Sequence, residues 1–390
     1  MFNKKSLEYG QNRSEIRELF EYGKSLKDKG VNVYDFTLGN PSTKTPDWVT
    51  SALLNGALKT DAHAYTSAQG SLVARKVIAK KLSALGSTSF SKENVILTCG
   101  AAASLCGVFR SLVSSNQDEI VVLAPYFPEY KVFIESAGAK FVTVGFLGDD
   151  FTPDFSALLK AINKNTKAVV INTPNNPSGK VFSADELSKI SDILHFKQIE
   201  LDSTIYLVSD EPYREINFSK TRNQVADFYE NTVVCYSFSK SLSLPGERIG
   251  YIAVGDKCAY SKDLISVCLG SLRQMGYVCA PSLFQHMLEN FEDSFSDFSV
   301  YEENKNLLVS ALTKYGFTCN DPKGAFYLML KAPDGNSRKM SERAKKLGLL
   351  IVPADSFGAE GFVRIATCVS TKTVKESLPF FETLALSYDL

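Results

Sequence analysis

Between residues 71 and 254 the chain alternates amphipathic stretches with short, almost wholly apolar runs. The amphipathic stretches repeat their apolar residues at helical spacing, which predicts helices over 71–86, 102–113, 128–138 and 183–196. The apolar runs predict strands over 94–100, 119–126, 140–146, 167–174, 205–213, 232–240 and 248–254. Apolar strands separated by helices indicate an α/β domain whose mostly parallel sheet is covered by helices on both faces.

The pattern changes beyond about residue 285. A charged helical stretch leads to three strand-like runs, at 324–332, 349–354 and 362–368, which are separated by helices. These elements predict a second, smaller α/β domain, and we expect an N-terminal helix over about 14–28 to join it. The predicted division is a large domain over 46–284, and a small domain built from 1–45 and 285–390.

Composition excludes several classes of function. The 43 lysines and arginines balance the 43 aspartates and glutamates, which argues against a nucleic-acid or anionic-membrane partner. No run approaches the roughly 20 apolar residues of a membrane span, and the N-terminus lacks the apolar core of a signal peptide. The eight cysteines are scattered without CxxC pairs, and the three histidines lack metal-ligand spacing. We therefore expect a cytoplasmic protein with reduced cysteines and no metal.

Candidate chemistry follows the predicted strands, because open parallel sheets bind ligands beyond the carboxyl ends of their strands. Gly100, Ala101 and Ala102 follow the first strand and open a helix, where free N–H groups suit a phosphate. Phe127 follows the second strand and can stack on a flat ring. Asn176 lies in the turn PNNPSG and can present an amide. Taken alone, each feature is more often an ordinary turn or a core residue.

Charged residues follow two further strands. Asp210 ends an apolar run, which is costly unless a cation pairs with it, and Tyr213 lies three residues on. Lys240 follows another apolar run among serines, with Arg248 eight residues later. One ligand satisfies all these groups through its phosphate, its aromatic ring, its protonated ring nitrogen, its phenolic oxygen and an aldehyde for an amine. That ligand is pyridoxal 5′-phosphate.

These residues occur in motifs that resemble a known family. From about residue 36 to near the C-terminus the chain is similar to the class I/II aminotransferases of the fold-type I pyridoxal-phosphate enzymes. SFSKSLSLPGERIGY resembles the family's lysine motif, which implies that Lys240 forms the Schiff base and that Ser237 and Arg248 bind the phosphate. The resemblance also implies a mostly parallel seven-stranded sheet in the large domain.

Two shorter motifs resemble the family's contacts to the cofactor ring. SDEPY is similar to its D-x-x-Y motif, which implies that Asp210 meets the pyridine nitrogen and Tyr213 the phenolic oxygen. NNPSG resembles N-P-[TS]-G, which implies that Asn176 contacts the same oxygen and lies beside the substrate. The backbone of GAAAS (Gly100, Ala101 and Ala102) falls where the family binds phosphate, and PYFPEY where it supplies the stacking aromatic, here Phe127.

Three further segments resemble parts of the family that contact the substrate or a second subunit. FTLGNP implies that Gly39 approaches the substrate, and FVRIA implies that Arg364 binds its α-carboxylate. AYTSAQG resembles the segment whose tyrosine crosses a dimer interface, which implies a homodimer in which Tyr65 reaches the neighbouring phosphate.

The resemblance implies a ping-pong aminotransferase that moves an amino group from an L-amino acid to a 2-oxo acid. A carbon–sulfur β-lyase on the same fold remains the alternative, because fold does not fix the reaction. The sequence leaves the amino donor open.

Overall fold

The computed structural model describes residues 2–11, 15–219, 221–292 and 294–390. Its helices, in chain order, are α1 (Lys4–Gln11), α2 (Glu15–Asp28), α3 (Asp47–Ala57), α4 (Leu72–Ser83), α5 (Ala101–Leu112), α6 (Glu129–Ala137), α7 (Phe155–Ala161), α8 (Ala184–Leu201), α9 (Phe238–Ser241), α10 (Ser261–Gln274), α11 (Ser282–Glu289), α12 (Ser299–Lys314), α13 (Ser337–Lys346) and α14 (Thr371–Leu386). Its strands are β1 (Tyr34–Asp35), β2 (Val95–Thr98), β3 (Glu119–Leu123), β4 (Lys140–Val144), β5 (Phe146–Leu147), β6 (Thr152–Pro153), β7 (Thr166–Asn172), β8 (Tyr206–Asp210), β9 (Thr232–Ser237), β10 (Gly250–Val254), β11 (Tyr327–Lys331), β12 (Leu349–Leu350), β13 (Val352–Pro353) and β14 (Phe362–Ala366). Within those described ranges, no helix is long and apolar enough to cross a membrane.

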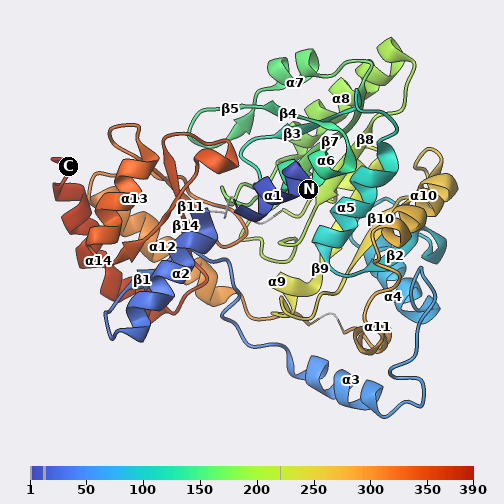
Figure 1. Cartoon of the computed structure of the whole chain (residues 1–390), viewed down its shortest axis with the longest axis horizontal. Coiled ribbons are helices and arrows are strands. Elements are labelled where there is room, and N and C mark those ends of the chain that lie inside the picture. Colours follow the sequence, from blue (N-terminus) through green and yellow to red (C-terminus); the bar gives the residue numbers. More distant parts are fainter. Residues whose placement is uncertain (1, 12–14, 220, 293) are drawn as a thin grey trace.

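The large sheet carries seven strands in the described chain, in the order β2-β10-β9-β8-β7-β3-β4. Strand β10 is antiparallel to both of its neighbours, and the other pairings that join β9, β8, β7, β3 and β4 are parallel. Figure 1 shows this sheet (blue at β2, then teal and green to yellow) with helices around it and the C-terminal elements to one side. The predicted mostly parallel seven-stranded α/β architecture is confirmed.

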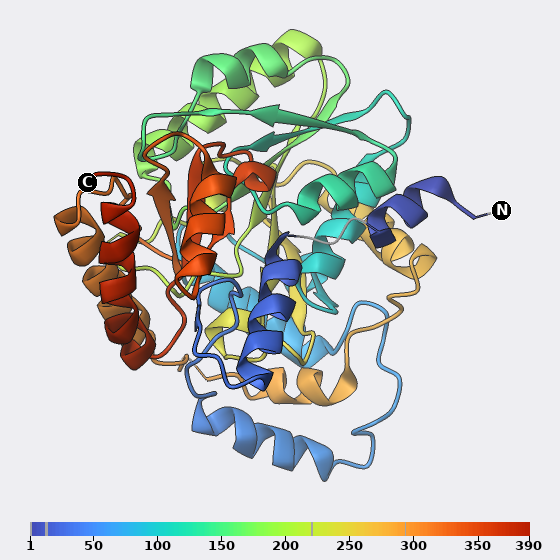
Figure 2. The same cartoon turned by 60° about the vertical axis from the view of Figure 1, so that its left-hand side comes forward.

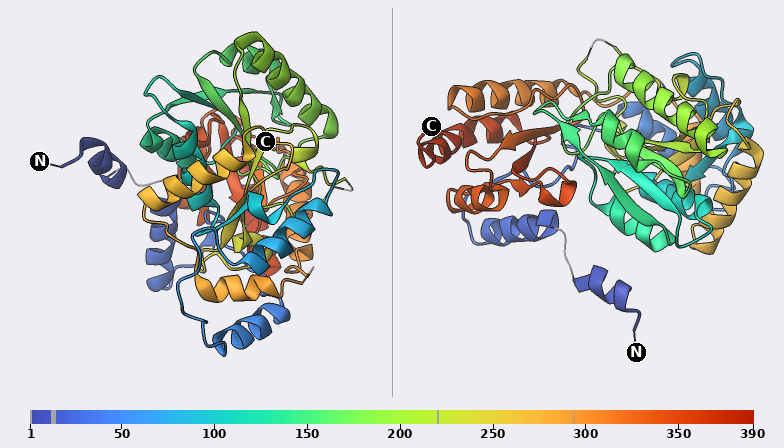
Figure 3. Two further views of the ribbon diagram at one scale, coloured as in Figure 1. Left: turned by 90° about the vertical axis from the view of Figure 1, so that its right-hand side faces the viewer. Right: turned by 90° about the horizontal axis from the view of Figure 1, so that it is seen from above.

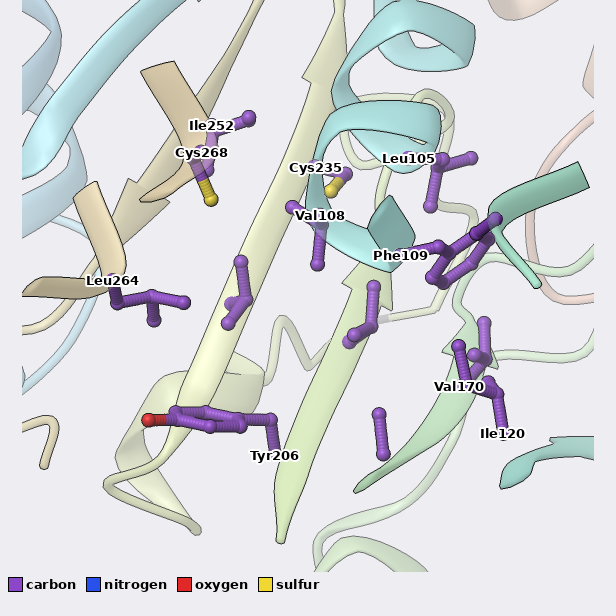
Figure 4. Packing of buried hydrophobic residues seen from close by; sticks show 14 of the residues in the cluster. Leu105, Val108, Phe109, Ile120, Val170, Tyr206, Cys235, Ile252, Leu264 and Cys268 are labelled. Atoms are coloured by element: carbon purple, nitrogen blue, oxygen red, sulfur yellow. The ribbon is translucent and has the colours of Figure 1, made fainter. Parts of the chain in front are cut away.

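Both faces of the large sheet are covered around its central strands, as the almost wholly apolar strand sequences predict, whereas the edge strand β4 is partly exposed. Helices α5, α6 and α10 pack on one face and α4, α7, α8 and α11 contribute to the cores on the other. Figure 4 shows the first of these cores, where Val108 and Phe109 of α5 lie near Cys235, Ile120 and Val170 of the strands. This two-sided core holds the strand ends, and whatever follows them, in fixed positions.

The reversed direction of β10 brings an additional segment to the edge where the parallel strands end. Gly250, the first residue of β10, lies opposite Thr98 at the end of β2 and Ser237 at the end of β9. The segment before β10 therefore meets the carboxyl ends of its neighbours. Arg248, two residues before Gly250, is placed at this edge as a consequence.

A second α/β unit contains the C-terminal sheet, which we define as β11, β14 and β13 in that antiparallel order. Strand β1, near the N-terminus, pairs in parallel with β12, and α2 packs against β12 and β13. Figure 2 shows α2 (blue) beside the orange and red C-terminal elements. Helix α2 and strand β1 thus pack with the C-terminal elements, whereas the division into domains at 45/46 and 284/285 stays a prediction.

Helix α1 lies away from this unit. Figure 3 shows it at the edge of the molecule, and Tyr9 on α1 donates a hydrogen bond to Glu135 on α6 at 2.7 Å. The predicted helix over 14–28 corresponds to α2, which begins at Glu15. Ser14 lies outside the described residues.

Two sequence predictions about strands are wrong in detail. The run 232–240 does not continue as a strand to Lys240, because β9 ends at Ser237 and α9 begins at Phe238. The Ser237 hydroxyl accepts a hydrogen bond from the backbone N–H of Ser239, and this cap starts the helix. The run 349–354 divides into β12 and β13, which join different sheets.

Candidate active site

Lys240 lies in α9 at the edge where the large sheet ends. Its Nζ donates a hydrogen bond to the backbone oxygen of Gly39 at 2.7 Å. The same atom lies 5.5 Å from the centre of the Phe326 ring, just before β11. Three segments that are distant in sequence therefore meet at this amine: α9, the segment after β1, and the start of the C-terminal sheet.

The surroundings of Lys240 make its amine a better nucleophile. Burial lowers the pKa of Lys240 from 10.5 to about 8, and the positive charges of Arg248 and Arg364 act in the same direction, against an opposing effect of Cys368. A lysine with an ordinary pKa is almost wholly protonated at pH 7.5, whereas Lys240 carries a substantial neutral fraction. The neutral form is the one that attacks an aldehyde.

This shift predicts the pH dependence of Lys240 reactivity. In the cofactor-free protein, modification of Lys240 by an amine-directed reagent should rise with pH and reach half its maximum near pH 8, because only the unprotonated amine reacts. Peptide mapping of the modified protein, with a Lys240→Arg variant as background, measures the rate at this site. A midpoint above pH 10 would contradict the prediction.

Asp210 ends β8 and is buried. Tyr130 of α6 donates a hydrogen bond to its Oδ2 at 2.5 Å, whereas Oδ1 has no hydrogen-bond partner within the described part of the chain. Burial raises the pKa of Asp210 to about 7, although the bond from Tyr130 lowers it. A buried carboxylate with one unsatisfied oxygen suits a cationic partner, such as a protonated ring nitrogen.

Tyr213 and Asn176 are each linked to a residue of the C-terminal sheet. The Tyr213 hydroxyl lies 3.1 Å from the Tyr327 hydroxyl. Asn176, whose N–H donates to the Asn172 side chain at 2.6 Å, accepts a hydrogen bond from Nη1 of Arg364 at 3.0 Å through its own Oδ1. The turn after β7 is thereby tied to β14.

Arg364 is 1% exposed and is held from several directions. Its Nη2 donates to the backbone oxygen of Thr37 at 2.5 Å. The guanidinium lies between two aromatic rings, 4.5 Å from the centre of Tyr327 and 4.9 Å from that of Phe357. Its Nε lacks a hydrogen-bond partner in the described residues, so part of the guanidinium fork is available to an anion.

Gly100 and Arg248 form the third part of the site. Gly100 is the N-cap of α5 with a φ of 84°, and a Cβ at this position would lie 2.6 Å from Nη2 of Arg248. Arg248 itself adopts a left-handed φ of 52°, which costs on the order of 1–3 kcal/mol. Its Nη1 donates to the Ser239 hydroxyl at 3.2 Å, and that hydroxyl lies 2.7 Å from the Ser237 hydroxyl. A guanidinium beside the N-terminus of a twelve-residue helix is an anion site.

Two predicted site residues have different surroundings. Phe127 contacts the Tyr130 ring edge-on, with 5.7 Å between the ring centres, so it lies on the Asp210 side of the site. Tyr65 is 94% exposed in the connection between α3 and α4. The structure therefore brings Phe127 to the cluster but leaves Tyr65 facing outward.

Sequence reasoning missed three residues that contact this cluster. Tyr130 stands in the same PYFPEY segment, three residues after Phe127, and its backbone N–H donates to the Phe127 oxygen at 3.0 Å. Ser239 lies inside the lysine motif, so the sequence could have identified it as a site residue. Tyr327 carries no such signal, because it reaches Tyr213 only through contact between the start of β11 and the segment after β8.

The cluster fits pyridoxal 5′-phosphate. The unsatisfied oxygen of Asp210 matches a protonated ring nitrogen. The close approach of Arg248 to Gly100 matches a phosphate, and the amine of Lys240, with its pKa near 8, matches an aldehyde. Three chemically distinct parts of one cofactor thus find suitable groups on this edge of the sheet.

The sequence profile of the family Aminotransferase class I and II matches residues 30–379. The chain belongs to this family. The aspartate/prephenate aminotransferase of Thermus thermophilus is 30% identical over 91% of this chain and 92% of its own length. The aspartate aminotransferase of Thermotoga maritima is 29% identical over 95% and 96%. The crystal structure of an amino transferase from Eubacterium rectale superposes with a TM-score of 0.97 at 45% identity, and the match covers 100% of both chains.

Membership of the class I and II aminotransferases establishes the type of activity. The protein is a pyridoxal-phosphate-dependent aminotransferase, which moves an amino group between an amino acid and a 2-oxo acid. The carbon–sulfur lyase alternative is not favoured, since the similar proteins are named as aminotransferases.

Proposed function

We propose that Lys240 is the proton-transferring residue of a ping-pong transamination that begins with an L-amino acid. When bound, pyridoxal 5′-phosphate supplies an aldehyde that combines with the donor amine and a cationic ring that accepts the electron pair left on the α-carbon. Lys240 Nζ accepts the α-carbon proton and returns it on the cofactor side. The pKa of about 8 carries this proposal, because it lets the amine accept and release a proton near neutral pH.

Four groups of residues would hold the cofactor. Asp210 would pair its free Oδ1 with the ring nitrogen, while Tyr213 and Asn176 would meet the phenolic oxygen. Phe127 would stack on the ring. The phosphate would lie at the N-terminus of α5, against Gly100, Ala101, Ala102, Ser237 and Arg248. The support for this assignment is the chemistry of each group and its place at one edge of the sheet.

Arg364 would bind the donor's α-carboxylate beside Gly39 and Asn176. Its guanidinium is buried, packed between two rings and has a free Nε, so a carboxylate can pair with it in a low-dielectric setting. Aspartate is the first donor to test, because several similar proteins are named as aspartate aminotransferases.

The absorbance spectrum of the purified holoenzyme tests the proposed reaction. We expect single L-amino acids, added without any 2-oxo acid, to convert the yellow lysine-bound cofactor stoichiometrically to the colourless amine form. The amino acids that do so are the donors. If the yellow band persists while pyruvate and ammonia accumulate from sulfur amino acids, transamination is the wrong reaction.

We also propose a cytoplasmic homodimer in which Tyr65 contacts the phosphate bound by the neighbouring subunit. Helix α11 packs against α3 and α4, and large apolar side chains on these elements and on the adjoining loops are exposed. They are Leu54, Leu58, Tyr65, Leu72, Val73, Tyr277 and Val278. A second copy of this chain would cover this apolar surface, and the exposed ring of Tyr65 would then meet the partner's site.

Mixed dimers test whether Tyr65 acts across the interface. Tyr65→Phe should weaken cofactor binding about 10- to 100-fold, the effect of one lost hydrogen bond to a charged group. Dimers that combine a Tyr65→Phe subunit with a Lys240→Ala subunit should recover about half of the normal activity, because one of their two sites then has both side chains intact. Activity that stays at the level of Tyr65→Phe would show that Tyr65 serves its own subunit.

A further inference from the structure

Tyr327 contacts several residues of the candidate site, although no prediction from the sequence assigned it a role. It begins β11 of the C-terminal sheet and is 3% exposed. Its hydroxyl lies 3.1 Å from that of Tyr213, and its ring lies 4.5 Å from Cζ of Arg364. A Cβ at Gly39 would lie only 1.8 Å from the same hydroxyl. The Gly39 backbone oxygen in turn receives the hydrogen bond of Lys240.

We propose that Tyr327 is a positioning residue with two contacts. Its hydroxyl orients the Tyr213 hydroxyl toward the cofactor's phenolic oxygen, and its ring packs against the Arg364 guanidinium. One side chain would then serve both halves of the site, the half that holds the cofactor and the half that holds the substrate carboxylate. The inference rests on the proposed function, in which Tyr213 meets the phenolic oxygen and Arg364 meets the carboxylate.

The direction of the hydrogen bonds follows from the number of protons available. Each tyrosine hydroxyl has one proton to donate, and the ionised phenolic oxygen of the cofactor only accepts. Tyr213 therefore uses its proton on the cofactor, and its oxygen is left to accept the proton of Tyr327. A chain of this kind, from Tyr327 to Tyr213 to the phenolic oxygen, strengthens each of its bonds by polarisation.

In the described part of the chain, the titratable groups that act on Tyr327 are compatible with its role as a donor. These groups are Tyr213 after β8, Arg364 on β14 and Cys368 just after β14, with Lys240 beyond Gly39. Burial raises the pKa of Tyr327 to about 12, although the charge of Arg364 opposes this effect. Burial likewise holds the pKa of Tyr213 well above its ordinary value. Both hydroxyls therefore keep their protons throughout the working range of pH.

A spectroscopic titration of the holoenzyme, without substrate, tests the link through Tyr213. The proton on the lysine–cofactor linkage offsets the negative charge of the phenolic oxygen. When the linkage loses this proton, a hydrogen-bond donor to the oxygen stabilises the remaining charge, so the donor lowers the pKa of the linkage. Tyr327→Phe removes only the hydroxyl, and the pKa of the linkage, read from its absorbance, should rise by about half to one unit. Tyr213→Phe should raise it further. The double variant should match Tyr213→Phe alone, because Tyr327 acts through Tyr213.

Donor kinetics test the link to Arg364. Tyr327→Phe keeps the ring and should leave the KM for the amino acid donor within about twofold, whereas Tyr327→Leu removes the ring and should raise it about 3- to 30-fold through loss of the cation–π contact. Tyr229→Phe is the matched control, since Tyr229 is a buried tyrosine whose hydroxyl donates to the backbone oxygen of Ile205 at 2.6 Å in the large-sheet core. Tyr229→Phe should change neither the pKa of the lysine–cofactor linkage nor the KM for the donor.

The outcomes separate this inference from the proposed function. If Tyr213→Phe leaves the linkage pKa unchanged, the proposed role of Tyr213 is wrong. If Tyr213→Phe shifts that pKa and Tyr327→Phe does not, the role of Tyr213 stands and the inference about Tyr327 is overturned. Additive shifts in the double variant would also overturn it, because they would mean that Tyr327 acts independently of Tyr213.

Discussion

Replacing Lys240 with alanine should lower the rate of transamination by about 10⁴-fold or more, the upper end of what general acid–base catalysis contributes. The loss is large because the same nitrogen would bond to the cofactor aldehyde and carry the proton between the two carbons. The neighbouring arginines do not substitute for it, since a guanidinium group donates hydrogen bonds and has no acceptor. Single-turnover measurements with a donor amino acid, followed by absorbance, give the rate directly.

The Lys240→Ala protein should still bind pyridoxal 5′-phosphate, now without a covalent bond. The groups proposed for the phosphate and the ring nitrogen are all retained, so equilibrium dialysis should detect the bound cofactor. Lys164, which is exposed, offers the matched control, and Lys164→Ala should transaminate normally. Near-normal turnover by Lys240→Ala would remove the basis of the proposed mechanism.

Asp210→Asn should reduce turnover by about two to three orders of magnitude. This variant keeps the shape of the side chain but removes the charge that would hold the ring nitrogen protonated, and breaking a buried ion pair costs about 3–5 kcal/mol. The cofactor ring would then accept the electron pair of the α-carbon poorly. Turnover within tenfold of the unaltered protein would show that another group protonates the ring.

Tyr130→Phe provides a graded comparison for Asp210. The Tyr130 hydroxyl donates to Asp210 and lowers its pKa, so removing the hydroxyl should raise that pKa above about 7. At neutral pH more of the carboxyl group would be protonated, and turnover should fall by about tenfold. Raising the pH should recover part of this loss in Tyr130→Phe and none of it in Asp210→Asn, whose side chain does not ionise.

The sequence predicted the large sheet because its strands carry their own signal. The runs 120–123 in β3 and 168–171 in β7 are apolar throughout, and only a strand covered on both faces buries every residue of such a run. The lysine motif and the residues after the strands likewise stand in short contiguous segments. Local sequence therefore defined the part of the site that the large sheet supports.

The part of the site around Arg364 depends on packing between segments that are distant in sequence. Local sequence does not indicate such contacts. Nothing in the sequence around Thr37 or Phe357 indicates that both residues contact Arg364. The end of β9 was misplaced for a related reason: the Ser237 cap turns the chain into α9, while the residues beyond it keep a partly apolar, strand-like pattern. Such contacts appear only once β11, β14 and the N-terminal segment have been assembled.

The pairing of β1 with β12 has a consequence for how the enzyme folds during its synthesis on the ribosome. Residues near the start of the chain find their partners close to its end, because Tyr34 pairs with Leu349 and Phe36 accepts a hydrogen bond from Ala366. At about 5–20 residues per second of synthesis, the segment that leads to Gly39 waits for roughly tens of seconds before its partners emerge. The proposed binding site for the substrate is therefore completed only after Leu349 and Ala366 have emerged, well after the sheet that leads to Lys240 has left the tunnel.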